Sequence, residues 1–140
     1  MAAIRVLVVD DSALVRQILT HVLGDASRIE VVGVARNGVE AVEAVLALRP
    51  DVVTLDIQMP EMDGMEALRL IVRDSDARVV MLTSVDDPET AYAALEAGAT
   101  DFIIKPREGL ASSIDRLTVE LVRAVKAAHC LLYTSPSPRD

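Results

Sequence analysis

Short apolar runs rich in β-branched residues recur along the chain and are separated by polar or turn residues. They cover Ile4–Val9, Ile29–Val34, Val52–Leu55, Val79–Leu82 and Phe102–Ile104. Runs such as VLVV and VVML are apolar at consecutive positions, which is typical of strands covered on both faces, as in a parallel sheet. The pattern therefore predicts five short, buried, parallel strands.

Segments with helical periodicity fill the intervals between these runs. They cover Ala13–Leu23, Val39–Leu48, Met65–Val72, Glu89–Ala97 and about Ser112–Ala128. In the first segment Leu14, Ile18 and Val22 recur at helical spacing after Ser12, which is expected to cap the helix. The glycines expected to end helices are Gly24 and Gly98. Strands that alternate with helices in this way predict an α/β fold, a doubly wound (βα)5 open sheet.

Composition narrows the possible functions by exclusion. A chain of 140 residues, 51% of them hydrophobic, is expected to form one domain with a real core. Its 14 basic and 22 acidic residues give a formal charge of −8, which argues against nucleic acid and favours a cation or a basic protein surface. No apolar run approaches the roughly 20 residues that cross a bilayer, and the N-terminus lacks the pattern of a signal peptide. We therefore expect a cytoplasmic location without membrane contact, which a single cysteine, Cys130, also fits.

The last residues, Cys130–Asp140 (CLLYTSPSPRD), differ from everything before them. They show no helical period and contain two prolines among serines and a threonine. The segment resembles the one-frame translation of a common transposase sequencing adapter, which matches all 11 residues. We therefore expect residues 1–129 to form the native domain and residues 130–140 to be a non-native, adapter-derived tail, with the natural protein continuing beyond His129.

Polar side chains follow the predicted strands at the edge where an open α/β sheet binds its ligands. Asp10 and Asp11 follow the first strand, Asp56 the third, Thr83 the fourth and Lys105 the fifth. Each pair of ionised carboxylates about 4 Å apart would repel by about 4 kcal/mol at an effective dielectric near 20, so the edge requires a cation. Oxygen ligands in small number favour Mg²⁺. A carboxylate nucleophile, a divalent cation, a lysine and a hydroxyl are the parts that phosphoryl transfer to an aspartate requires.

At this point the sequence resembles the receiver domains of bacterial two-component response regulators, over residues 4 to about 128. The motifs that carry the resemblance are VVDDS at Val8–Ser12, LDIQMPEMDG at Leu55–Gly64, MLTS at Met81–Ser84 and AGATDFIIKP at Ala97–Pro106. The resemblance implies a flavodoxin-like receiver fold, with strand order 2-1-3-4-5 and helices on both faces. It also implies phosphorylation by a histidine kinase as the phosphodonor.

The resemblance also assigns roles to single residues. It implies that Asp56 is the phosphoacceptor and that the Mg²⁺ ligands are Asp10, Asp11, Asp56 and the backbone carbonyl of Gln58. It implies that the phosphoryl group is bound by Thr83 and Lys105, and that the residues that change conformation on phosphorylation are Thr83 and Phe102. It also implies that the Lys105–Pro106 peptide is cis. Taken singly, these residues have plainer interpretations: Asp10 and Asp11 as helix caps and Phe102 as a core aromatic. Asp63–Gly64 is expected to be turn chemistry, and Met59, Met62 and Met65 are expected to pack against the sheet.

A finer resemblance points to the N-terminal receiver of chemotaxis protein-glutamate methylesterases. It rests on DDSALVRQILTHVL, IEVVGVARNGVEAVEAV, VVTLDIQMPEMDGMEAL and DFIIKP before a long final helix. In that family a methylesterase domain with a Ser/His/Asp triad follows the receiver. This chain has only His21 and His129 and no glycine-flanked catalytic serine, so we expect a regulatory domain that is not itself an enzyme.

Two alternatives remain beside this interpretation, and a third fails. A stand-alone receiver, or one attached to a DNA-binding domain, would carry the same motifs. A Mg²⁺-dependent phosphohydrolase with an aspartate nucleophile is remote, because Asp56 is followed by Ile57 and Gln58 rather than by an Asp-x-Asp pair. A dinucleotide-binding fold is disfavoured because the first turn, VDDSAL, contains no glycine.

Overall fold

Five strands alternate with five helices in the computed structural model, which describes residues 3–57, 59, 62–84, 88–105 and 114–134. The elements are β1 (Ile4–Val9), α1 (Ala13–Gly24), β2 (Ile29–Ala35), α2 (Gly38–Leu48), β3 (Val52–Asp56), α3 (Gly64–Asp74), β4 (Arg78–Ser84), α4 (Pro88–Glu96), β5 (Asp101–Lys105) and α5 (Ile114–Thr134). Each predicted strand and helix is present, and within the first 129 residues most boundaries move by no more than two residues. The apolar runs therefore located the elements correctly.

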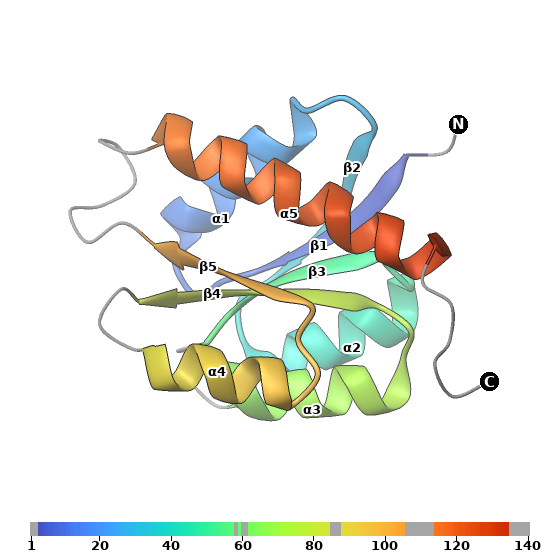
Figure 1. Cartoon of the computed structure of the whole chain (residues 1–140), viewed down its shortest axis with the longest axis vertical. Helices are drawn as coiled ribbons and strands as arrows, with labels where there is room; N and C mark the ends of the chain where they lie inside the picture. The colour runs from blue at the N-terminus through green and yellow to red at the C-terminus, as the bar shows by residue number, and fades with distance from the viewer. Residues whose placement is uncertain (1–2, 58, 60–61, 85–87, 106–113, 135–140) are drawn as a thin grey trace.

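The strands form one parallel sheet in the order β2-β1-β3-β4-β5 (Figure 1). This order reverses direction at β1, so the loops after β1 and β3 diverge to opposite faces of the sheet at its carboxyl edge. β1 and β3, two of the three interior strands, are almost wholly buried, as their unbroken apolar runs predict. The predicted flavodoxin-like order is thus confirmed.

Helices cover both faces of the sheet and divide the core in two. α1 and α5 lie on one face, and α2, α3 and α4 on the other (Figure 1). Alternate residues of β1 supply both cores: Val6 and Val8 pack under α1 and α5, whereas Leu7 and Val9 pack on the opposite side. The site at the strand ends is therefore held between two packed layers.

The buried face of α1 differs from the one that its Leu14, Ile18 and Val22 spacing indicates. Leu19 and Leu23 are the buried residues, whereas Leu14 is 66% exposed. Both sets recur every four residues on neighbouring faces of the helix, so spacing alone could not choose between them. The buried face of α1 is the one that packs against the sheet, and this face carries Leu19 and Leu23.

Side-chain caps fix where the helices begin. Ser12 accepts a hydrogen bond from the Val15 backbone N–H at 3.2 Å, as predicted, and Asp63 accepts one from Glu66 at 2.9 Å. Gly98 follows α4 with φ of +116°, a conformation that favours glycine. The Asp63–Gly64 pair is thus turn and cap chemistry, as expected.

The last helix runs beyond its expected end near Ala128. α5 continues without a break from Ile114 to Thr134, across the boundary between His129 and Cys130. Among the residues of α5 whose side chains are described, which end at Cys130, the last buried one is Ala128. None of the helices, over the described residues, is long and apolar enough to cross a membrane.

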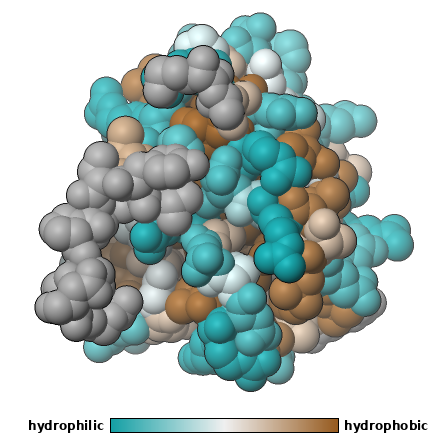
Figure 2. All heavy atoms as spheres, turned by 90° about the vertical axis from the view of Figure 1, so that its right-hand side faces the viewer, coloured by the Kyte–Doolittle hydropathy of each residue, from teal (hydrophilic) through white to brown (hydrophobic). Residues whose placement is uncertain are grey.

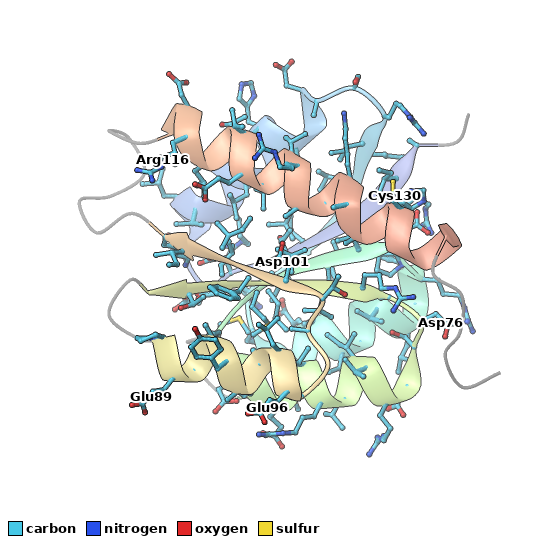
Figure 3. The ribbon with its side chains drawn as sticks, viewed as in Figure 1. Asp76, Glu89, Glu96, Asp101, Arg116 and Cys130 are labelled. Carbon is cyan, nitrogen blue, oxygen red and sulfur yellow. The ribbon has the colours of Figure 1, made fainter. Side chains whose placement is uncertain are left out.

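A groove lies at the amino edge of the sheet. Figure 2 shows this side, and Figure 3 labels Asp76 on it. The open groove of about 550 Å³ lies between the ends of α2 and α3 and is lined by charges of both signs, including Arg49 and Asp51. Arg73 and Asp74 in its wall pair with each other at 2.8 Å. The groove lining thus mixes two basic with three acidic side chains, so it carries less net negative charge than the strand-end cluster.

Candidate functional site

Four strands bring the predicted chemical groups to one edge of the sheet. Asp10 and Asp11 follow β1, Asp56 ends β3, Thr83 lies near the end of β4, and Lys105 ends β5. This edge is on the left in Figure 1, where the arrowheads of β4 and β5 point. Segments up to 95 residues apart in the sequence therefore meet at the site, as parallel strand ends must.

Two of the three carboxylates lie beneath the surface. Asp10 is 0% exposed and Asp56 7% exposed, whereas Asp11 is exposed. Thr83 is also buried, at 3% exposure. Buried charges need partners, because burial removes the water that would stabilise them. The site must therefore supply positive charge from within.

Lys105 supplies part of that charge. Its Nζ lies 2.9 Å from Asp10 Oδ2 and 3.4 Å from Asp56 Oδ1. The ammonium thus bridges the ends of β1 and β3 from β5. Burial by itself would lower the pKa of Lys105, but the charges of Asp56 and Asp10 and hydrogen bonds to both more than offset it, so the pKa is raised above its ordinary value. Lys105 is therefore positively charged at neutral pH.

The remaining negative charge fits a metal ion. One carboxylate oxygen from each of Asp10, Asp11 and Asp56 lies within 4.8 Å of the others. Three carboxylates and one ammonium leave a net of two negative charges, which matches a divalent cation. Because the donors are all oxygens, they suit a hard cation such as Mg²⁺ rather than a metal that prefers nitrogen or sulfur.

Local hydrogen bonds hold Asp10 in place. Its Oδ1 accepts the Ser12 backbone N–H at 3.0 Å, and its backbone N–H donates to the Ala35 carbonyl at 3.0 Å. Its own carbonyl oxygen accepts a hydrogen bond from Arg16 Nη1 at 2.7 Å. Sequence reasoning missed Arg16, although its position six residues after Asp10, on the first turns of the predicted helix, was the available signal.

Two glycines hold the segment that follows Asp56. The Gly64 N–H donates to the Ile57 carbonyl at 2.7 Å, and the Gly38 N–H donates to the Met62 carbonyl at 3.1 Å. A Cβ on Gly64 would meet the carbonyl oxygen of Asp56 and lie 2.6 Å from Ile57 Cα. Glycine is therefore required at Gly64 for α3 to begin so close to the site.

Three other predictions concern residues around the cluster. Phe102 is partly buried and packs against the core formed with α2, α3 and α4, which fits its interpretation as a core aromatic. Met59, Met62 and Met65 pack against the same core, as expected. Gln58 and Pro106 lie outside the described residues, so the predicted carbonyl ligand and the cis Lys105–Pro106 peptide stay predictions.

Comparison with known families identifies the domain. Residues 6–115 match the family model described as the response regulator receiver domain. The chain belongs to this family. Its receiver fold is also that of a crystal structure of the response regulator domain of CheB from Thermotoga maritima, with a TM-score of 0.85 and 41% identity, covering 91% of this chain and 96% of that one.

Other similarities concern a methylesterase and a chain of a CheX–CheY complex. A protein-glutamate methylesterase/protein-glutamine glutaminase from Archaeoglobus fulgidus is 52% identical over 126 residues, 89% of this chain and 36% of the relative. The chain thus spans about two fifths of the length of the curated relatives it matches. The CheX–CheY–BeF3–Mg²⁺ complex from Borrelia burgdorferi contains a chain with a TM-score of 0.70 and 32% identity, covering 86% of this chain and 91% of that one.

Proposed function

We propose that this receiver domain accepts a phosphoryl group on Asp56 from a phosphohistidine of a histidine kinase and thereby switches an output domain. The observation that carries the proposal is the Lys105 ammonium, which lies between buried Asp10 and Asp56 at an edge with excess negative charge. This arrangement places a phosphate-binding cation beside a carboxylate nucleophile.

The chain's own residues divide the chemistry. An oxygen of Asp56 attacks phosphorus, the P–N bond of the phosphohistidine breaks, and the imidazole leaves with the electron pair of that bond. Lys105 offsets the charge that gathers on the phosphoryl oxygens, and the Thr83 hydroxyl is the candidate donor to one of them. Asp10, Asp11 and Asp56 would hold a Mg²⁺ ion, and when bound it would supply the further positive charge that phosphoryl transfer requires.

The switch proposed here follows from the new charge. A phosphoryl group on Asp56 adds strong acceptor oxygens, which draw Thr83 and Lys105 toward it. Movement at Thr83 would open space that Phe102, on the neighbouring strand, can fill. The affected surface includes exposed Tyr92 on α4 and exposed Ile104 on β5. Phosphorylation would then shift the balance between two states of this surface.

The proposed output is a protein-glutamate methylesterase domain that follows the receiver in the natural protein. Support comes from the 52% identity to the Archaeoglobus fulgidus methylesterase, of which this chain matches 36%. In this proposal the receiver covers the methylesterase site until Asp56 is phosphorylated. Methylesterase activity would belong to the longer protein, and the chain described here would be its regulatory part.

Phospho-labelling tests the assignment of Asp56. Purified chain is incubated with Mg²⁺ and radiolabelled acetyl phosphate, and acid-stable and base-labile label is measured per chain. Asp56→Asn should abolish labelling without changing the circular dichroism spectrum, and excess chelator should stop labelling of the unchanged chain. Asp76→Asn, at the opposite edge, is the matched control and should label normally. Retained label in Asp56→Asn would refute the assignment, and steady phosphate release from many phosphomonoesters would instead favour a hydrolase.

A further inference from the structure

The Asp11 carboxylate is held differently from the other two carboxylates of the cluster, those of Asp10 and Asp56. Asp10 and Asp56 both contact Lys105, whereas no hydrogen bond or ion pair to the Asp11 carboxylate is found within the described part of the chain. Its oxygen nevertheless comes within 4.8 Å of oxygens of the other two. The backbone must therefore determine where this carboxylate lies.

Arg16 controls that backbone. The Asp10 carbonyl belongs to the peptide unit that joins Asp10 to Asp11, and Arg16 Nη1 donates to this oxygen at 2.7 Å. A peptide unit is planar, so fixing its oxygen also fixes the direction in which the Asp11 N–Cα bond leaves it. The guanidinium donates through a rigid planar fork, which suits it to hold one orientation.

Glu40 on α2 pairs with Arg36 at 2.8 Å. Hydrogen bonds from Arg36 come first among the causes that lower the pKa of Glu40, burial opposes them, and the charge of Arg16 makes the smallest contribution. The hydrogen bond to the Asp10 carbonyl is therefore the contact on which the effect of Arg16 depends.

We infer that Arg16 is a positioning residue for the metal site, which orients the Asp10–Asp11 peptide so that the Asp11 carboxylate faces Asp10 and Asp56. The inference rests on the proposed function and adds a residue to it. Replacing Arg16 should therefore change the affinity for Mg²⁺ in a definite direction. Removing a positive charge near a cation site strengthens cation binding if charge alone matters. Losing the positioning weakens it, by about tenfold where an orienting partner of a metal ligand is removed.

Mg²⁺ titration of Arg16→Met by isothermal calorimetry distinguishes these effects. We expect the Mg²⁺ dissociation constant to rise about tenfold, and the Mg²⁺ concentration for half-maximal labelling by acetyl phosphate to rise equally. The labelling rate at saturating Mg²⁺ should stay within about twofold of the unchanged chain, because Asp56 and Lys105 are intact. Arg36→Met is the matched control: it removes the same charge from the same rim without touching the Asp10 carbonyl, and should bind Mg²⁺ at least as tightly as the unchanged chain.

Arg16→Lys keeps the charge and a single donor, and should restore part of the affinity. If Arg16→Met fails to fold, as judged by circular dichroism, the same titration of Arg16→Lys decides, with an expected dissociation constant between those of the unchanged chain and the tenfold increase. The inference is overturned if Arg16→Met, or Arg16→Lys where Arg16→Met does not fold, binds Mg²⁺ at least as tightly as the unchanged chain. If the unchanged chain binds no Mg²⁺ and takes no label, the proposed function fails and this inference fails with it, whereas a defect confined to the Arg16 variants leaves the proposed function standing.

Discussion

Lys105 is the residue on which the charge balance of the strand-end cluster depends. Its ammonium contacts Asp10 at 2.9 Å and Asp56 at 3.4 Å, and both of these carboxylates are buried. Removing one partner of a buried ion pair costs more than the pair contributes, because the remaining charge has no solvent. The same lysine therefore serves stability when no metal is bound and phosphate binding during the reaction.

The variant Lys105→Met should lower the free energy of unfolding by about 1–3 kcal/mol in urea titrations with chelator present. Added Mg²⁺ should restore much of the loss, since a cation then compensates the three carboxylates. The pKa of Lys105 is raised in the fold, so its stabilising effect is complete below its ordinary pKa and is lost only as pH rises through the higher folded value. The difference between the two chains should thus be constant between pH 7 and pH 9.

Lys126→Met is the control for that experiment. It removes the same charge from the second half of α5, which runs toward the opposite edge of the sheet (Figure 1). Its effect on the free energy of unfolding should be within about 0.5 kcal/mol and independent of Mg²⁺. Equal losses for the two lysines would show that Lys105 does not compensate buried carboxylates.

At the scale of elements, the sequence predicted what depends on local pattern and missed what depends on neighbours. Unbroken apolar runs located β1 and β3, and Ser12 located the start of α1. The buried face of α1 could not be chosen, because Leu14 and Leu19 both belong to apolar sets at helical spacing. Only the position of the sheet and of α5 buries Leu19 and leaves Leu14 exposed.

Two glycines, one packed against backbone atoms and one in open space, give a matched pair of variants. Gly64→Ala places a Cβ against the backbone of Asp56 and Ile57, which cannot move without displacing the phosphoacceptor proposed here. We expect it to lower the free energy of unfolding by about 1–3 kcal/mol and to slow labelling by acetyl phosphate. Gly24→Ala, at the end of α1, meets no atom within 4 Å. It should leave labelling unchanged and raise the free energy of unfolding by up to about 1 kcal/mol.

These two effects are measured by urea unfolding and by the initial rate of labelling. The pair controls for the loss of a glycine as such, since both variants gain one methyl group. A Gly64→Ala chain that labels at the normal rate would show that the close approach of α3 to β3 does not position Asp56.

For the whole molecule, topology explains why the site could be predicted in outline. Parallel strands end at one edge, so residues that follow β1, β3, β4 and β5 had to converge once the order of the strands was known. The sequence could not predict the contacts of Arg16 with Asp10 or of Gly64 with Ile57, because they depend on side-chain direction and on distances between loops. These contacts hold the reactive groups rather than perform the reaction.

The extent of the native domain can be tested by shortening the chain. We propose that residues 130–140 add nothing to the receiver, although α5 continues to Thr134, because Ala128 is the last buried residue of α5 up to residue 130 and Cys130 is exposed. Further helical turns add little stability of their own, since isolated helical turns are marginal in water. A chain of residues 1–129 should therefore unfold within about 2 °C of the full chain in calorimetry and accept the same label per molecule.

A chain ending at Leu121 is the contrasting variant, because it removes buried Val125 and Ala128, and it should lose most of its cooperative unfolding. If the 1–129 chain instead melts many degrees lower, Cys130–Thr134 belongs to the folded domain and the adapter-derived interpretation of that segment is wrong.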